Sequence, residues 1–269
     1  MSLLKRLGIL VSGNRLVQRR LAKRVRFCQD LMGIGSGDRP EASGERRLFH
    51  EIRRRSPGPW CVMDVGANCG QFLRLALRSM PASDTRIHCF EPGAHAFEQL
   101  RTAASGASHV LLNRLAIGAS VGNATLHYQA PGSGLASLTR RDLEHFGIDF
   151  GLSEPVQVTT VDDYCERLGI ERVHLLKLDI EGHELDAIQG ARRMLQQGRI
   201  DALTFEFGGC NIDTRTYFRD FWKVLHGHGM TIHRITPSGF WHRIDRYDEA
   251  HEQFRTTNFV ARRTMAAPA

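Results

Sequence analysis

Short apolar runs alternate with longer stretches of helical periodicity along most of the chain. The apolar runs predict buried strands at 60–65, 86–92, 109–118, 173–182 and 200–209. Between and around them, apolar residues recur every third or fourth position, which predicts helices at 45–55, 70–79, 94–104, 161–169, 183–195 and 214–228. Strands that alternate with helices imply right-handed crossovers, so we expect an α/β fold with a mostly parallel sheet.

The alternation is interrupted in the middle of the chain and changes near its end. Residues 124–130 alternate like an exposed hairpin strand, and 131–155 are rich in glycine and resemble a loop. We expect this loop either to cover a site or to be a plain insertion. Asp162 is the expected cap of the short helix that follows. The segments 230–236, 240–245 and 257–263 predict the last strands.

Residues 1–45 differ from the rest of the chain. Apolar residues at helical spacing run through 2–27, interrupted at Asn14, with the bases largely on other sides of the helix. A basic amphipathic helix can lie on an anionic membrane surface, pack on its own domain or bind a partner. The segment 33–45, rich in glycine, serine and proline, predicts a linker. We therefore expect an N-terminal helix and linker over 1–45 and one domain over 46–269.

The positive charge of the chain belongs to this N-terminal region. The sequence has 36 lysines and arginines against 29 acids, and residues 1–27 hold eight of these bases and no acid. Residues 28–269 therefore carry 28 bases against 29 acids and are close to neutral. A body without excess positive charge gives no reason to expect a nucleic-acid partner.

The six cysteines indicate a reducing compartment. They form no CxxC pair, so the pattern is neither that of a zinc site nor that of a secreted disulfide framework. Charges interrupt every apolar run before it reaches the length of a membrane span, and the N-terminus lacks the features of a signal peptide. We expect a cytoplasmic protein, with peripheral contact at the inner face of the membrane through residues 2–27 as an option.

The segment DVGANCG carries the clearest chemical signal. Asp64 ends the first predicted strand, and Gly66, Asn68 and Gly70 follow at alternate positions before a helix. This arrangement points backbone N–H groups and a helix N-terminus at a ligand, although it also occurs as a plain connecting turn. A strand-terminal acid favours a cationic ligand group over a pyrophosphate. Glu91, at the end of the second strand, can accept hydrogen bonds from a ribose diol.

Together, these two acids point to a nucleoside that has a cationic amino-acid arm and no phosphate. S-adenosyl-L-methionine is such a molecule. The motifs DVGANCG, FEP, NRLAIG, TTVDD, KLDIEGHELDAIQGA and NFVARR, within residues 58–263, also resemble the FkbM-type family of S-adenosyl-L-methionine-dependent methyltransferases.

The resemblance implies a class I methyltransferase (Rossmann-like) fold, with a seven-stranded, mainly parallel sheet, flanking helices and an antiparallel strand near the C-terminus. It also implies O-methylation of a hydroxyl of a glycan, glycolipid or related natural product. The turn would hold the methionine arm, Glu91 the ribose, and two further residues the adenine. Carried onto this sequence, the cofactor-binding residues are Asp64, Gly66, Ala67, Asn68, Gly70, Glu91, Asn113 and Ala116.

The segment KLDIEGHE is the expected place of acceptor chemistry. Methyl transfer to a hydroxyl requires in-line placement and removal of a proton. Asp179 ends a central strand and is our first candidate for the base, with Glu181 and His183 behind it. The alternative to catalysis for Glu181 and His183 is a structural role, in which they cap the following helix. Lys177 can pair with a neighbouring carboxylate.

No metal is required by the sequence. If a divalent cation takes part, Asp179 and Glu206 at adjacent strand ends are its expected ligands. The acceptor pocket is expected from 131–155 and 208–216, with Trp241 and His242 as weaker candidates. Two other functions stay open at this point: a nucleic-acid methyltransferase, prompted by the basic N-terminus, and a non-catalytic, membrane-associated protein with the same fold.

Overall fold

The main sheet places the C-terminal ends of five parallel strands along one edge. The computed structural model of the protein describes residues 3–35 and 45–263. Strands β3, β2, β1, β7 and β8 are parallel neighbours in that order, and β11 pairs with β8 in the antiparallel sense. Beyond β11, β9 pairs with β11 and β10 pairs with β9, both in the antiparallel sense, so that β9 runs in the same direction as β8. Their bounds are β1 Trp60–Val65, β2 Thr85–Phe90, β3 Val110–Asn113, β7 Leu175–Leu178, β8 Ala202–Phe207, β9 Met230–Ile235, β10 Trp241–Ile244 and β11 Thr257–Arg263.

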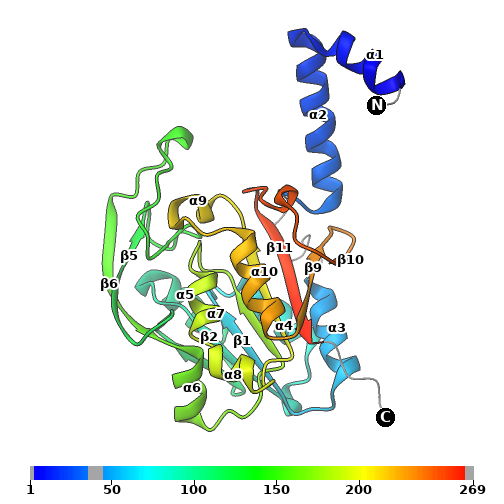
Figure 1. Ribbon diagram of the computed structural model, residues 1–269. Coiled ribbons are helices and arrows are strands. Elements are labelled where there is room, and N and C mark those ends of the chain that lie inside the picture. Colours follow the sequence, from blue (N-terminus) through cyan, green and yellow to red (C-terminus); the bar gives the residue numbers. More distant parts are fainter. Residues whose placement is uncertain (1–2, 36–44, 264–269) are drawn as a thin grey trace, which may run out of the picture.

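The expected α/β fold is confirmed. The seven strands implied by the resemblance are present, with β11 as the antiparallel strand near the C-terminus, and β10 adds an eighth at the edge. Figure 1 shows helices on both faces of this sheet. The helices of the domain are α3 Arg46–Arg55, α4 Gln71–Ser79, α5 Ala94–Ala103, α6 Val161–Leu168, α7 Glu184–Gln189, α8 Arg192–Gln196, α9 Cys210–Thr214 and α10 Phe218–Gly227, with short 3₁₀ turns at Ala82–Asp84, Glu144–Phe146 and Glu249–His251.

Alternating strand residues supply the cores on the two faces of the sheet. Val62 packs with side chains of α3, α4 and α5, whereas its neighbour Met63 packs with those of α6, α7, α8 and α10. Both are fully buried. A strand whose successive side chains point to opposite faces and are all buried reads as a continuous apolar run. This explains why the sequence pattern predicts the central strands well.

A second, smaller sheet corrects the expected strand at 109–118. That segment divides into β3 in the main sheet and β4 Ala116–Ile117, which pairs with β6 Leu152–Thr159. The hairpin strand β5 Gly122–Tyr128 completes this sheet in the order β4-β6-β5. Residues 152–155, expected in a loop, therefore belong to a strand. Only long-range pairing creates this sheet, so the local pattern does not reveal it.

Two helix boundaries also differ from expectation. The helix expected over 183–195 is interrupted at Gly190, where a Cβ would lie 2.1 Å from the carbonyl oxygen of Gly118. The side chain of Thr160, not Asp162, caps α6 by accepting the N–H of Asp163. Asp162 instead accepts the N–H groups of Arg193 and Met194 in α8. The helix expected from 214 starts at Phe218, after the separate helix α9.

The N-terminal region forms two helices that stand away from the domain (Figure 1). Helix α1 spans Leu3–Ser12 and α2 spans Arg15–Met32, five residues beyond the expected end of the helical region. Asn14, expected to interrupt the helical pattern, is the N-cap of α2 and accepts the N–H of Val17 at 3.0 Å. No helix within the described ranges has the length and apolarity that a membrane span needs. Most of the expected linker, 36–44, lies outside the described residues, and the division at residue 45 stays a prediction.

Candidate active site

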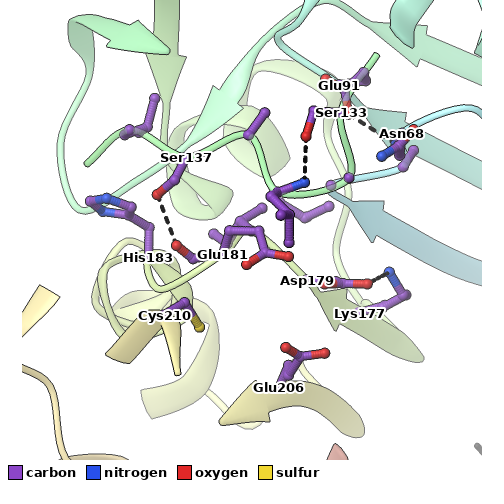
Figure 2. A pocket seen from close by; sticks show the side chains of 18 of the residues that line it. Asn68, Glu91, Ser133, Ser137, Lys177, Asp179, Glu181, His183, Glu206 and Cys210 are labelled. Carbon is purple, nitrogen blue, oxygen red and sulfur yellow. Dashed lines mark hydrogen bonds and ion pairs between the residues drawn. The ribbon is translucent and has the colours of Figure 1, made fainter. Parts of the chain in front are cut away.

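A cavity of about 630 Å³ opens at the C-terminal ends of the central parallel strands. Figure 2 shows Asn68 and Glu91 toward one end of this pocket, Glu206 and Cys210 toward the other, and Asp179 between them. The volume lies in the ordinary range of small-molecule sites. Its position is the one at which parallel α/β sheets bind ligands.

The turn after β1 is shaped by contact with β7. Gly66 has φ 79°, and a Cβ on this residue would lie 1.8 Å from the carbonyl oxygen of Asp179. The N–H of Asp179 donates to the carbonyl oxygen of Val65 at 3.1 Å, which fixes the two strand ends beside each other. Only glycine permits this approach. Asn68 also has a positive φ, 46°, so the turn is a concave loop of backbone at the cavity wall.

Glu91 is held by two backbone N–H groups. Its Oε2 accepts from Asn68 at 2.9 Å and its Oε1 accepts from Gly93 at 2.8 Å. Burial raises the pKa of Glu91 to about 7, against the lowering effect of these two hydrogen bonds. Each carboxylate oxygen accepts one hydrogen bond and has capacity for another. Glu91 therefore ties the first turn to β2 and presents two acceptors at the cavity.

Lys177 joins two acids at the ends of neighbouring strands. Its Nζ lies 3.0 Å from Oδ2 of Asp179 and 3.5 Å from Oδ1 of Asp64. The expected pairing of Lys177 with a neighbouring carboxylate is therefore confirmed. Burial disfavours the ammonium, but Asp179 and Asp64 together raise the pKa of Lys177. Asp64 is fully buried and does not line the cavity, and burial raises its pKa, which the charge of Lys177 opposes.

The loop after β7 is fixed by a buried acid. Glu184 is completely buried and accepts the N–H of Ile180 at 2.9 Å and that of Gly182 at 3.1 Å. This contact supports a left-handed backbone at Glu181, φ 54°. The loop then presents Asp179 and Glu181 at the cavity wall. The N-cap position of α7 is occupied by His183, and α7 has no side-chain cap, so Glu181 does not cap this helix.

A segment between β5 and β6 covers the cavity from the other side. Ser137 Oγ donates to the carbonyl oxygen of Glu181 at 2.8 Å. Arg141 forms ion pairs with the carboxylates of Glu181 and Asp213, and its side chain is only 7% exposed. Of the two open readings of 131–155, the structure supports a cover, because residues 133–138, Arg141 and Phe146 line the cavity.

The two other candidates for the base, Glu181 and His183, both have fixed partners. The carboxylate of Glu181 forms an ion pair with Arg141. Burial and then the charge of Asp179 raise the pKa of Glu181 to about 8, although Arg141 opposes both effects. His183 is also engaged at both ring nitrogens: Nδ1 with Asp186 at 2.7 Å and Nε2 with Thr139 at 3.0 Å. These contacts fit positioning roles for Glu181 and His183 in the cavity wall.

Glu206 differs from the other acids of the cavity. Its carboxylate has no hydrogen-bond or ion-pair partner in the part of the chain that the structure describes. Burial, then the charges of Asp179 and Glu181, raise the pKa of Glu206 well above its ordinary value. Within 3–35 and 45–263, no group of three or more histidines, cysteines or acids is placed to hold a metal ion. The expected metal pair of Asp179 and Glu206 includes one acid that Lys177 already binds.

Nine of the twelve site residues considered from the sequence line the cavity: Gly66, Ala67, Asn68, Glu91, Ala116, Asp179, Glu181, His183 and Glu206. The other three lie behind its wall. Gly70 is the N-cap of α4, and Asn113 donates its amide to the carbonyl oxygen of Cys89 at 3.1 Å. Asp64 contacts Lys177 beneath the turn.

Parts of the segments that we expect to form the acceptor pocket line the cavity. From 208–216, Gly209 and Cys210 line it. Trp241 does not; it packs in the core beneath α3, and His242 is exposed on the edge strand. Arg141 and Arg255 line the cavity but were missed by sequence reasoning, because both lie in segments without periodicity.

Comparisons with known proteins identify the family of the chain. A family model described as the Methyltransferase FkbM domain matches residues 64–231, more than half of the chain. Over 150 residues, the chain is 26% identical to 2-O-methyltransferase NoeI of Sinorhizobium fredii (strain NBRC 101917 / NGR234), a match that covers 51% of this chain and 60% of that protein. The chain thus spans about three fifths of the relative that it matches.

Two solved structures are similar in their overall course. Methyltransferase FkbM from Methylobacillus flagellatus KT has a TM-score of 0.45 and 17% identity, over 80% of this chain and 50% of that one. A SAM-dependent methyltransferase from Agrobacterium tumefaciens has a TM-score of 0.42 and 10% identity, over 84% of this chain and 62% of that one.

Proposed function

The chain belongs to the FkbM methyltransferase domain family, and we propose that it transfers a methyl group from S-adenosyl-L-methionine to a hydroxyl oxygen. The observation that carries this proposal is one cavity that joins an amide-held carboxylate, Glu91, to the acids Asp179 and Glu206. The relative NoeI is a 2-O-methyltransferase, which supports oxygen as the methylated atom.

The cavity wall fits the cofactor at the turn after β1. Glu91 has one free acceptor position on each oxygen, which suits the two hydroxyls of a ribose. Gly66, Ala67 and Asn68 form the concave backbone that would hold the methionine arm, and Ala116 lines the wall proposed for the adenine. Gly70, Asn113 and Asp64 act behind this wall as positioning residues. When bound, S-adenosyl-L-methionine supplies a methyl group on a cationic sulfur.

Glu206 and Asp179 are the candidates for handling the acceptor hydroxyl. A carboxylate paired with an ammonium is a weaker base, and Lys177 holds Asp179 in that way. An ionised carboxylate without a fixed partner is better placed than a paired one to take a proton from the hydroxyl. We assign proton removal to Glu206 and orientation of the hydroxyl to Asp179. In this assignment the acceptor hydroxyl would give its proton to Glu206 and take the methyl group as the bond from that carbon to sulfur breaks, so that S-adenosyl-L-homocysteine would leave.

The charge of the cavity argues against nucleic acid as the acceptor. Five acids and three bases line it: Glu45, Glu91, Asp179, Glu181 and Glu206 against Arg141, Lys177 and Arg255. Lys177 and Arg141 are each paired with two carboxylates, and Arg255 is paired with Asp30. Such a wall repels phosphates. A neutral acceptor that carries hydroxyls, such as a glycan, a glycolipid or a related natural product, fits it better. The retained Gly66–Asn68 turn also argues against a non-catalytic protein.

Calorimetric titration with S-adenosyl-L-methionine and S-adenosyl-L-homocysteine tests the proposal. We expect binding of both by the wild-type chain and a loss of at least about tenfold in affinity for Glu91→Ala. Glu98→Ala, an exposed change on α5, is the matched control and should bind normally. If the folded wild-type chain binds neither molecule, the proposed function is wrong. Activity that survives EDTA would exclude a need for a divalent metal.

The cellular setting is part of the same proposal. The reducing cysteine pattern favours the cytoplasm, and the N-terminal helices favour peripheral contact with the inner face of the membrane. The way in which α2 joins the domain defines this contact and bears on the choice of acceptor.

A further inference from the structure

Exposed apolar side chains are concentrated on the N-terminal arm, which we define as α1 and α2, residues 3–32. The arm carries nine of the seventeen large hydrophobic residues that are exposed in the described chain: Ile9, Leu10, Val11, Leu16, Leu21, Val25, Phe27, Leu31 and Met32. No residue of α2 is buried. An apolar concentration of this kind marks a surface that another phase or molecule covers.

One apolar line of α2 lies opposite several of its bases. At 100° per residue, Leu21, Val25 and Met32 lie on one side of the helix. The bases Arg15, Arg19, Lys23 and Arg26 lie roughly opposite. A second apolar line, Leu16, Phe27 and Leu31, is interleaved with Arg20 and Arg24, whose long stems can reach polar headgroups while their own carbons cover apolar surface.

The charge of the arm selects among the surfaces that could cover it. Asp30 is the single acid within 3–32, and it is paired with Arg255 of the domain at 3.1 Å. A second copy of the arm would present the same positive charges and be repelled. An anionic bilayer complements both properties, because apolar side chains enter its interface and bases remain at the headgroups.

The last turn of α2 is fixed to the domain through several polar contacts. Arg255 donates to Oε1 of Gln29 at 2.7 Å and pairs with Asp30. Arg234 donates from Nε to the carbonyl oxygen of Met32 at 2.9 Å. Gly33 follows with φ 88°, where a Cβ would lie 2.3 Å from the carbonyl oxygen of Ile235. The direction of the arm relative to the domain is therefore set by the fold.

The residues that fix the arm also line the cavity. Gly35 donates its N–H to the carbonyl oxygen of Thr256 at 2.8 Å, and Gly35, Arg255 and Thr256 are all part of the cavity wall. Ile235, against which Gly33 packs, is the C-terminal residue of β9, at the same edge of the sheet as the cavity. The base of the arm is thus continuous with the wall of the candidate active site.

We propose that the arm lies on an anionic lipid bilayer and that the cavity takes an acceptor whose hydroxyl-bearing headgroup is attached to a lipid of that bilayer. This inference rests on the proposed methyl transfer for the nature of the reaction. A cavity held at the bilayer surface reaches headgroups without extraction of the lipid chains. The acid-lined wall makes that headgroup an uncharged, hydroxylated one, while the anionic lipids that hold the arm are its neighbours.

Vesicle binding by the full chain is the first test. We expect co-sedimentation with vesicles of phosphatidylcholine and phosphatidylglycerol, weakened by salt, and much weaker binding to phosphatidylcholine alone. Leu21→Glu with Val25→Glu should reduce binding at least about tenfold. Leu168→Glu with Val121→Glu, exposed apolar residues away from the arm, is the matched control and should bind normally. Equal binding by both double variants would overturn the membrane contact.

Methyl incorporation separates this inference from the proposed function. Labelled S-adenosyl-L-methionine is incubated with the chain and either the lipid extract, reconstituted in vesicles, or the water-soluble glycans of cells that express it. We expect label in the lipid fraction, a large loss of that label for the arm variant on vesicles, and recovery in detergent. Label confined to soluble glycans would overturn the lipid-linked acceptor but not the transfer. Failure to bind S-adenosyl-L-methionine would instead overturn the proposed function, whatever the vesicle result.

Discussion

Gly66 lies so close to Asp179 that a Cβ on the glycine would be 1.8 Å from the carbonyl oxygen of the aspartate. The contact joins the turn proposed for the cofactor to the loop proposed for the acceptor. It also makes the two motifs of the sequence, DVGANCG and KLDIEG, parts of one wall.

Gly66→Ala should therefore damage both binding and stability. The added Cβ must displace one of two strand ends, and we expect about 2 kcal/mol or more of destabilisation together with at least about tenfold weaker cofactor binding. Urea unfolding and calorimetry measure the two effects. Gly106→Ala is the matched control: φ is 80° there too, but nothing lies within 4 Å of the added Cβ. If both variants lose the same stability, the backbone conformation and not the contact with Asp179 explains the glycine.

Ionisation of Glu91 should make the ligand-free chain less stable as pH rises. Its folded pKa of about 7 lies above the ordinary value of 4.5, so the folded state binds the extra proton between these pH values. The unfolding free energy then falls with rising pH through this window, by about 1–3 kcal/mol from this group. Glu91→Gln should show a flatter pH profile in urea unfolding than the wild type. An equally steep profile would show that Glu91 ionises normally in the fold.

Replacing Lys177 should expose the cost of burying the carboxylate of Asp64. Lys177→Met leaves Asp64 fully buried without its cation, and we expect a loss of about 3–5 kcal/mol in unfolding free energy. Lys177→Met combined with Asp64→Asn should recover most of that loss in the same unfolding experiment. No recovery would mean that the two residues act independently of each other.

Arg141 should control the acceptor more than the cofactor. Removing its ion pairs with Glu181 and Asp213 frees the cover from the loop after β7, so Arg141→Gln should raise KM for the acceptor with little change in affinity for S-adenosyl-L-methionine. Its neighbour Arg140, which is exposed and pairs with Asp149, is the matched control. Normal acceptor kinetics in Arg141→Gln would place acceptor recognition elsewhere in the cavity.

The central strands and the first turn were predictable because their physical causes are local. Val62 and Met63 are both apolar because they are buried on opposite faces of the same sheet. Gly66 is needed because the chain after β1 lies against the chain after β7 at this point. The departure of the chain from the main sheet at β4 was not predictable, because β6, the strand with which β4 pairs, lies about forty residues further along the sequence. Long-range pairing leaves no local period in the sequence.

The placement of strand-terminal acids shows the same limit at the site. Sequence position puts Asp64 at a strand end, yet Val65 follows it within β1 and Asp64 pairs in register with Lys177 inside the sheet. Glu206 has the same kind of position but lines the cavity. Which face a strand residue takes is set by pairing and pleat, and a single acid carries no signal of it. Arg141 lies in a loop whose contacts arise only in the folded chain.

Glu206→Gln should reduce methyl transfer without reducing cofactor binding. Loss of a general base typically costs about 10²–10⁴-fold in rate. Asp179→Asn should reduce the rate too, but with a change in the KM of the acceptor, because Asp179 is assigned to its orientation. A normal rate in Glu206→Gln would return the role of base to Asp179.

The central claim, transfer of a methyl group from S-adenosyl-L-methionine to a hydroxyl oxygen, is tested most directly by the atom that receives the label. The chain is incubated with ¹³C-methyl-labelled S-adenosyl-L-methionine and cell-envelope extract, and the product is examined by NMR and mass spectrometry. We predict a labelled methoxy group that appears with the wild type and is lost in Glu91→Ala. Label on nitrogen or carbon, or no transfer by a chain that binds the cofactor, would contradict the account.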